Sequence, residues 1–183
     1  MNTNFRPNVC VFSDDRQYRY TLDHDERDSF STPYVAWIGL NPSIADERNL
    51  DRTLNKVLQF TRKRGFHRFV MVNLFAFVSP LPKVMRNNTE PIGEENDRHI
   101  LEICGGATDI ICCWGNDGDH RGRAEQVLQL LTRFDLYCLG RTATGQPRHP
   151  LYLSVEKTAF EVYRSSSVGY GADRAGRHAV ILT

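Results

Sequence analysis

Four short apolar runs recur along the chain, and a polar or glycine-containing loop follows each of them. The runs cover residues 35–38, 69–72, 109–114 and 136–139. A continuous apolar run of this length is typical of a strand that is buried on both faces of a parallel sheet. The pattern therefore predicts four buried strands, each ending in a loop that could carry functional groups.

Segments with the apolar spacing of helices separate these runs. They cover residues 51–65, 94–104 and 121–134. Asp51 can cap the first of these helices, and Gly65 can end it in the left-handed conformation. Because strands and helices alternate, right-handed βαβ units are expected. We predict a three-layer α/β/α fold around a short, mostly parallel sheet of four strands.

The segments outside this alternating region are expected to be peripheral. Two β-prone runs flank the turn-forming residues 13–15, which predicts an N-terminal β-hairpin as an edge decoration. The connection at 79–91 is rich in Pro and Asn, and we predict either a functional loop or an excursion over the site. The expected organisation is one domain over residues 1–183, with the hairpin at 9–22, a core at about 30–154 and an extension at 155–183.

Composition narrows the classes of protein and partner. The 183 residues, 40% of them hydrophobic, suit a single core and hence a single site. A net charge of +1 gives no overall cationic field that would require a nucleic acid, although a local basic groove remains possible. No stretch approaches the roughly eighteen apolar residues of a membrane span, and the polar N-terminus lacks the apolar core of a secretion signal. We expect a cytoplasmic protein with no membrane partner, and the sequence does not indicate an oligomeric state.

The cysteines and histidines do not form a recognisable metal-binding pattern. The five cysteines contain no CxxC pair, and the six histidines are scattered along the chain. Zinc and iron–sulfur sites use more closely spaced ligands. Buried, reduced thiols are therefore predicted, together with no metal and no cofactor.

Polar residues and glycines gather in the four loops that follow the apolar runs. The loops read GLNPS at 39–43, VNLFAF at 72–77, CWGND at 113–117 and GRTATGQPRHPLYLS at 140–154, the second and third including the strand end. In an open α/β sheet, ligands bind beyond the carboxyl ends of the strands. The four loops are therefore expected to meet around one crevice.

In order and content these loops resemble the motifs of the uracil-DNA glycosylase superfamily. Its mismatch-directed branch has a GxNPG loop first and an HPSPLS-like loop last, which are similar to the segments around Asn41 and His149. Between them lie a strand ending in Asn, here Asn73, and a strand ending in Trp-Gly, here Trp114. Over residues 9–154 the chain also resembles a bacterial family, domain of unknown function 1643, through its LNPS and HPLYL signatures. That second resemblance implies no established function.

The glycosylase resemblance implies metal-independent hydrolysis of an N-glycosidic bond in DNA. Asn41 would position the attacking water, and His149 would donate a hydrogen bond to the leaving base. Asn73 would read the base through its amide, which both donates and accepts. The other positions implied to contact the substrate are Gly39, Leu40, Pro42, Ser43, Phe75, Trp114 and Asn116.

The last loop is implied to contact duplex or single-stranded DNA. Its candidate residues are Arg141, Arg148, Leu151, Tyr152, Leu153 and Ser154. The two arginines can meet phosphates, and the apolar side chains supply the wedge that an enzyme needs when it removes a base from the stack. Ser43 stands where the uracil-excising members with an Asp motif carry a Tyr that excludes methylated bases. The resemblance therefore favours a larger or modified pyrimidine.

Ordinary structural roles compete with several of these assignments. Asn41 can bind loop backbone before the following Pro, Asp51 is better explained as a helix cap than as a base, and Trp114 as core packing. Ser43 has no evident His–Asp partner in the sequence and is a poor candidate nucleophile. Two other functions stay open, a non-catalytic nucleic-acid or nucleotide binding module of the same fold and an N-glycosidase of free nucleosides or nucleotides.

Overall fold

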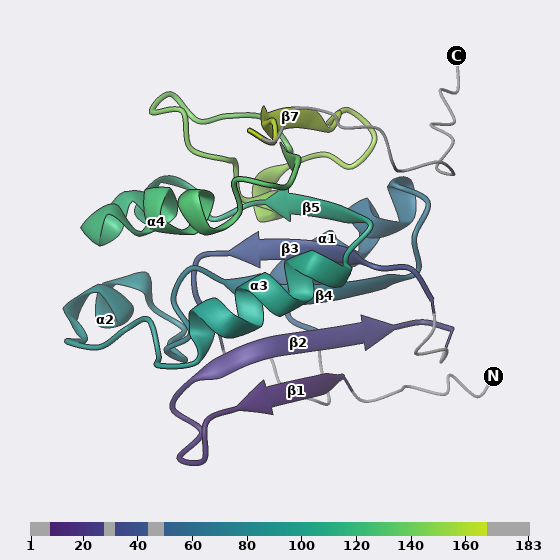
Figure 1. The fold of residues 1–183 in the computed structure, drawn as a ribbon. Helices are drawn as coiled ribbons and strands as arrows, with labels where there is room; N and C mark the ends of the chain where they lie inside the picture. Colours follow the sequence, from purple (N-terminus) through teal and green to yellow (C-terminus); the bar gives the residue numbers. More distant parts are fainter. Residues whose placement is uncertain (1–7, 28–31, 44–49, 168–183) are drawn as a thin grey trace.

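A computed structural model describes residues 8–27, 32–43 and 50–167 (Figure 1). In this part of the chain, seven strands form one sheet in the order β1-β2-β4-β3-β5-β6-β7. The strands are β1 (Val9–Phe12), β2 (Arg19–Asp25), β3 (Val35–Gly39), β4 (Arg68–Asn73), β5 (Asp109–Cys112), β6 (Leu136–Cys138) and β7 (Glu161–Arg164). The helices are α1 (Arg52–Lys63), α2 (Pro82–Asn87), α3 (Asn96–Gly106) and α4 (Arg123–Leu130), and the 3-10 segments are η1 (Asn116–Gly122) and η2 (Pro150–Tyr152).

The sheet is mixed. Its three central pairs, β4 with β3, β3 with β5 and β5 with β6, are parallel. The three outer pairs, β1 with β2, β2 with β4 and β6 with β7, are antiparallel. The predicted α/β class is confirmed, whereas the predicted four-stranded, mostly parallel sheet was wrong. The four expected strands form the middle of a larger sheet.

The N-terminal hairpin is an integral part of this sheet. Strands β1 and β2 pair as predicted, but β2 also pairs with β4, where Leu22 lies opposite Met71. Leu22 is fully buried and belongs to the core. The interpretation of the hairpin as an edge decoration is therefore corrected, because β2 buries its own apolar side chains beside the parallel strands.

Helices cover both faces of the sheet, with α3 and α4 on the face opposite α1. Alternate residues of β3 divide between two apolar clusters. Ala36 and Ile38 pack in the cluster that contains residues of α3 and α4, while Val35 and Trp37 pack in the one that contains residues of α1. The indole Nε1 of Trp37 donates to Thr61 Oγ1 at 3.0 Å and joins β3 to α1. This is the period-two alternation of a strand buried on both faces.

The helix boundaries confirm some predictions and correct others. Asp51 caps α1 by accepting a hydrogen bond from Leu54 N at 2.8 Å, and Gly65 follows the helix with φ +92°. The connection at 79–91, expected to be irregular, contains the short helix α2, which has a proline in its first turn. The helix expected from residue 121 begins as α4 only after Gly122, because the backbone is non-helical at His120 and Arg121 and left-handed at Gly122, which has a φ of +66°.

The five cysteines are free thiols, as predicted. Four of them are buried and Cys10 is half-buried. Burial raises the pKa of Cys104 to about 12 and that of Cys138 to about 11. These thiols are therefore protonated at neutral pH.

Two features are absent from the described residues. Across that part of the chain, no helix is long and apolar enough to cross a membrane. No group of three or more His, Cys, Asp or Glu side chains there could hold a metal ion.

Candidate functional site

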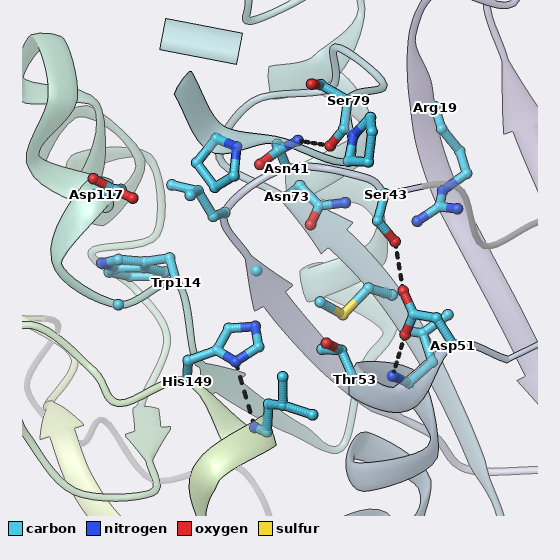
Figure 2. Close-up of a pocket in the computed structure, with 18 of the residues that line it drawn as sticks. Arg19, Asn41, Ser43, Asp51, Thr53, Asn73, Ser79, Trp114, Asp117 and His149 are labelled. Carbon is cyan, nitrogen blue, oxygen red and sulfur yellow. Dashed lines mark hydrogen bonds between the residues drawn. The ribbon is translucent and has the colours of Figure 1, made fainter. Parts of the chain in front are cut away.

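A cavity of about 510 Å³ lies at the carboxyl ends of the central parallel strands (Figure 2). Loops that follow β3, β4, β5 and β6 all contribute to its wall, as expected for this edge of an open α/β sheet. Of the residues predicted to form a site, it brings together Gly39, Leu40, Asn41, Ser43, Asn73, Trp114, Asn116, His149, Leu151 and Tyr152. Segments separated by more than a hundred positions in the sequence therefore share one cavity.

The other predicted residues lie outside the cavity lining. Pro42 is buried, and Phe75 and Leu153 are buried members of the two apolar clusters. Phe75 N donates to Leu40 O at 3.0 Å, so the chain after Asn73 is held against the preceding loop while the Phe75 ring packs in the core. The structure thus gives Phe75 and Leu153 packing roles.

The polar residues of the last loop that were expected to contact DNA are also outside the cavity. Arg141 donates to the carbonyl oxygens of Val162 at 3.3 Å and Tyr163 at 2.8 Å, and so fastens β7 to the loop. Ser154 Oγ donates to Glu156 at 2.8 Å. Arg148 is exposed and remains available to an external anion.

Asn41 presents an acceptor to the cavity. Its amide Nδ2 donates to Pro42 O at 3.0 Å and to Ser79 O at 2.8 Å. Both amide protons are therefore engaged, and two neighbouring carbonyl oxygens fix the orientation of the amide. Within the described part of the chain Oδ1 has no hydrogen-bond partner, so it can accept a hydrogen bond from a ligand or a water.

Asn73 is a buried amide that no described residue satisfies. It is 2% exposed at the end of β4 and lines the cavity. Its Oδ1 lies so close to Gly39 that a Cβ there would approach it to 2.7 Å, and Met71 Cε to 2.4 Å. A larger residue at position 39 would have to displace the ends of the Met71 and Asn73 side chains. The amide of Asn73 opens on the cavity, where it can both donate a hydrogen bond to a ligand and accept one from it.

A second, buried amide holds the backbone that carries Asn73. Asn96 Nδ2 donates to Asn73 O and to Leu74 O, both at 3.0 Å. Arg123 Nε also donates to Leu74 O at 2.9 Å, and its guanidinium is paired with Asp97. The position of the Asn73 side chain is therefore set by contacts from α3 and α4.

His149 presents a donor to the same cavity. Its Nδ1 accepts a hydrogen bond from Leu151 N at 3.4 Å, which places the ring proton on Nε2. Burial lowers the pKa of His149 below its usual 6.5, and the nearby charge of Asp51 opposes this only in part. The imidazole is therefore neutral at pH 7, with its Nε2 proton free to bind an acceptor in the cavity.

Ser43 and Asp51 form a pair in the cavity wall. Ser43 Oγ donates to Asp51 Oδ2 at 2.5 Å, while Asp51 Oδ1 accepts from Leu54 N (Figure 2). The serine therefore has a carboxylate partner and no histidine between them, unlike a catalytic triad. This arrangement does not activate Ser43 as a nucleophile in the way that a Ser–His–Asp triad does.

The wall after β5 combines an aromatic ring with polar side chains. Trp114 is 2% exposed, lines the cavity and belongs to the core, and its Nε1 donates to Gln146 Oε1 at 2.8 Å. Asn116 Oδ1 accepts from Thr144 Oγ1 at 2.7 Å, and Asp117 is paired with Arg86 at 2.5 Å. The core-packing interpretation of Trp114 holds, and the ring also borders the cavity.

The mouth of the cavity has apolar side chains on two sides. Tyr152, on η2, is 84% exposed and also lines the cavity. From the connection at 79–91, Ser79, Pro80 and Pro82 reach the cavity, and the adjacent Leu81 is exposed. That connection therefore borders the site, which was one of its two expected roles.

The lining includes residues outside the segments that were expected to form the site: Arg19, Thr53, Leu54 and Met71. Ser79, Pro80, Pro82, Gly115 and Asp117 line the cavity from segments that were expected there, although none of the five was singled out as a site residue. Arg19 is 3% exposed and reaches the cavity because β2 pairs with β4. The sequence contains no signal for this antiparallel pairing. Asp51 was expected only as a cap, which it is, and it lines the cavity as well.

Comparison with known proteins identifies a family and nothing closer. No curated protein and no solved structure matches the chain. The expected likeness to the uracil-DNA glycosylase superfamily therefore receives no support from these comparisons. The family described as "Protein of unknown function (DUF1643)" matches residues 19–151, which is most of the chain and includes nearly all of the cavity lining. The chain belongs to the DUF1643 family.

Proposed function

We propose that this protein hydrolyses the N-glycosidic bond of a modified or mismatched pyrimidine in DNA. The observation that carries the proposal is the convergence of three side chains on one cavity: Asn41 from the loop after β3, Asn73 from the end of β4 and His149 from the loop after β6. These are the three residues to which the motif resemblance assigns the water, the base and the leaving-group oxygen. Had they lined different surfaces, the proposal would have no site.

The hydrogen-bonding groups in the cavity suit the edge of a pyrimidine. Asn73 offers both an acceptor and donors, which complement an N–H and a neighbouring carbonyl oxygen of the ring. His149 offers the Nε2 proton to a second carbonyl oxygen. Trp114 supplies an apolar wall beside these groups.

The chemistry follows from where charge develops. Cleavage of the glycosidic bond leaves negative charge on the departing base and positive charge on the deoxyribose. A neutral His149 can stabilise the negative charge by donating a hydrogen bond, which strengthens as the carbonyl oxygen becomes anionic. Asn41 Oδ1 can accept a hydrogen bond from the attacking water and orient it, although an amide cannot take the proton.

The size of the cavity and the residue at 43 favour a substituted base. The volume of about 510 Å³ is within the usual range for small-molecule sites, about 300–1,000 Å³. Ser43 is a small side chain turned toward Asp51, so it leaves space where a larger residue would close the pocket. We infer that the substrate base carries a methyl group or a larger substituent at the ring position of the thymine methyl.

DNA is favoured over a free nucleotide by the mouth of the cavity. A free nucleotide would be best held by a closed pocket, whereas Tyr152 projects into solvent at 84% exposure. An exposed aromatic ring beside a base pocket can fill the space left in the stack when a base is extruded. Arg148, also exposed in the same loop, can meet a phosphate.

A single-turnover assay with enzyme in excess tests this function. Duplexes that carry uracil, a thymine mismatch or a hypermodified pyrimidine are incubated with the protein, and abasic sites are detected by alkaline strand cleavage. We expect at least one modified duplex to be cut, with the rate falling by about a hundredfold in Asn41→Ala and His149→Ala. His67→Ala, which changes a histidine outside the cavity, is the matched control and should retain the wild-type rate.

The same assay separates the alternatives. Absence of abasic product from every duplex would contradict the enzymatic proposal. Tight, salt-sensitive DNA binding without turnover would favour a binding module, because counterion release requires several phosphate contacts. Release of base from free nucleosides but not from DNA would favour the nucleoside N-glycosidase.

A further inference from the structure

Asp51 has more contacts than a helix cap requires. The capping role uses Oδ1, which accepts from Leu54 N at 2.8 Å. The second oxygen, Oδ2, accepts from Ser43 Oγ in the cavity wall. A carboxylate has about four lone-pair sites, so two hydrogen bonds leave Asp51 with acceptor capacity that faces the cavity.

The position of Asp51 relates it to the two proposed catalytic residues. Ser43 belongs to the same loop as Asn41, so its hydrogen bond draws the Asp51 carboxylate to that loop. On the other wall, the charge of Asp51 acts on His149 and raises its pKa, against the larger lowering caused by burial. The charged or titratable side chains that line the cavity are Arg19, Asp51, Asp117, His149 and Tyr152, and Asp117 is paired with Arg86.

A hydrolase built on Asn41 alone would lack a proton acceptor. An amide can orient a water molecule but cannot accept its proton, and His149 is already a donor through Nε2. Asp117 is held in its ion pair with Arg86 on the wall after β5. Asp51 is the carboxylate that is tied to the Asn41 loop.

We propose that Asp51 is the general base of the reaction, with Ser43 as the residue that positions it. This inference rests on the proposed glycosylase function. As the C1′–N bond breaks, its electron pair leaves with the base, and a bond forms between C1′ and the water oxygen. The proton lost by that water passes to the Asp51 carboxylate, while His149 stabilises the departing base. The anionic carboxylate also stabilises the positive charge that develops on the sugar.

Replacement by Asn separates the chemical role from the cap. Asn is as good an N-cap as Asp, so Asp51→Asn should keep α1 intact while it removes the proton acceptor. We expect a fall in the single-turnover rate of about a hundredfold or more, since general acid–base catalysis typically contributes about 10²–10⁴. The control is Asp109→Asn, which removes a carboxylate paired with Arg64 at the opposite end of β5 and should leave the rate unchanged.

Chemical rescue adds a readout that a structural role would not affect. Asp51→Gly leaves space for a small acid at little cost to the cap. Formate is expected to restore part of the rate in this variant and to leave the wild type and Asp109→Asn unaffected. Asn and Gly are both tolerated at an N-cap, so we expect both Asp51 variants to fold.

The outcomes distinguish this inference from the function on which it rests. If wild-type protein releases no base from any substrate, the proposed function fails and Asp51 loses its role with it. If wild-type protein releases base and Asp51→Asn does so within about threefold of the same rate, the general-base assignment alone is overturned. A slow Asp51→Gly variant that formate does not accelerate would overturn it equally.

Discussion

The side-chain amide of Asn41 donates a hydrogen bond to the carbonyl oxygen of Ser79 at 2.8 Å and so joins the loop after β3 to the loop after β4. Its other proton is donated to Pro42 O at 3.0 Å. Both contacts require a donor, and the oxygen that remains is turned to the cavity. The residue at position 41 is therefore constrained by the fold as well as by the proposed chemistry.

This contact predicts that Asn41→Asp will lower both stability and activity. The expectation holds even though the strongest uracil-excising members of the superfamily that the motif resembles carry an Asp at the position of Asn41. An ionised Asp would set a negative oxygen against two carbonyl oxygens and leave both without a donor. We expect a loss of about 1–3 kcal/mol in the free energy of unfolding, measured by urea denaturation, and a slower base release. Higher activity with unchanged stability would contradict this arrangement.

The buried contact of Asn96 gives a second prediction. Asn96→Ala removes the donor to the carbonyl oxygens of Asn73 and Leu74 and should lower the free energy of unfolding by about 1–3 kcal/mol. The matched control is Asn55→Ala, because Asn55 also donates to two backbone carbonyl oxygens but on an exposed surface. Denaturant curves should show a clearly smaller loss for the control, and equal losses would contradict the importance of burial.

The pH dependence of stability should report His149. Its pKa is lowered by burial, so below about pH 6.5 the unfolded chain binds a proton that the folded protein does not. Unfolding free energy attributable to His149 is therefore lost as the pH falls. The free energy of unfolding of His149→Gln, measured relative to that of wild type, should therefore increase as the pH drops from about 8 to about 5. His24 and His99, whose pKa values burial also lowers, contribute equally to both proteins and cancel.

An NMR titration checks the same residue directly. The His149 ring should titrate with a midpoint below its usual 6.5 and should show the Nε2-protonated tautomer above it. A midpoint above 6.5 would mean that the ring is a cation near neutral pH, which contradicts a neutral hydrogen-bond donor.

The exposed ring of Tyr152 gives a prediction that distinguishes duplex from single-stranded substrates. Because its side chain is 84% exposed, Tyr152→Ala should leave the free energy of unfolding within about 0.5 kcal/mol of wild type. If the ring acts as a wedge, single-turnover rates should fall on duplex substrates and hold on single strands, whose bases need no extraction. Equal losses on both substrates would assign Tyr152 to the pocket and remove the wedge.

The central strands could be predicted because burial on both faces leaves an unmistakable pattern. Residues 35–38 are apolar without interruption, and the structure places them in β3 between two layers of helices. The outer strands carry weaker signals. Strand β7 has no fully buried position, and β2 runs on into Asp23 and Asp25, which alone would indicate a loop.

The cavity was partly predictable for a related reason. Parallel strands bring their carboxyl ends together, so Asn41, Asn73 and His149 could be expected at one edge from their places in the sequence. Arg19 could not, because it enters through the antiparallel pairing of β2 with β4. The second role of Asp51 was hidden because capping is a complete explanation of an Asp at a helix start.

Joint detection of the released base and of the abasic sugar tests the central claim most directly. Wild-type protein in excess is incubated with a duplex containing a modified pyrimidine, and the products are analysed by mass spectrometry. We expect one free base for each abasic sugar formed, with both signals falling about a hundredfold in Asn41→Ala and His149→Ala over the same early interval. Intact DNA after incubation with every duplex, single-stranded and modified substrate would contradict this claim.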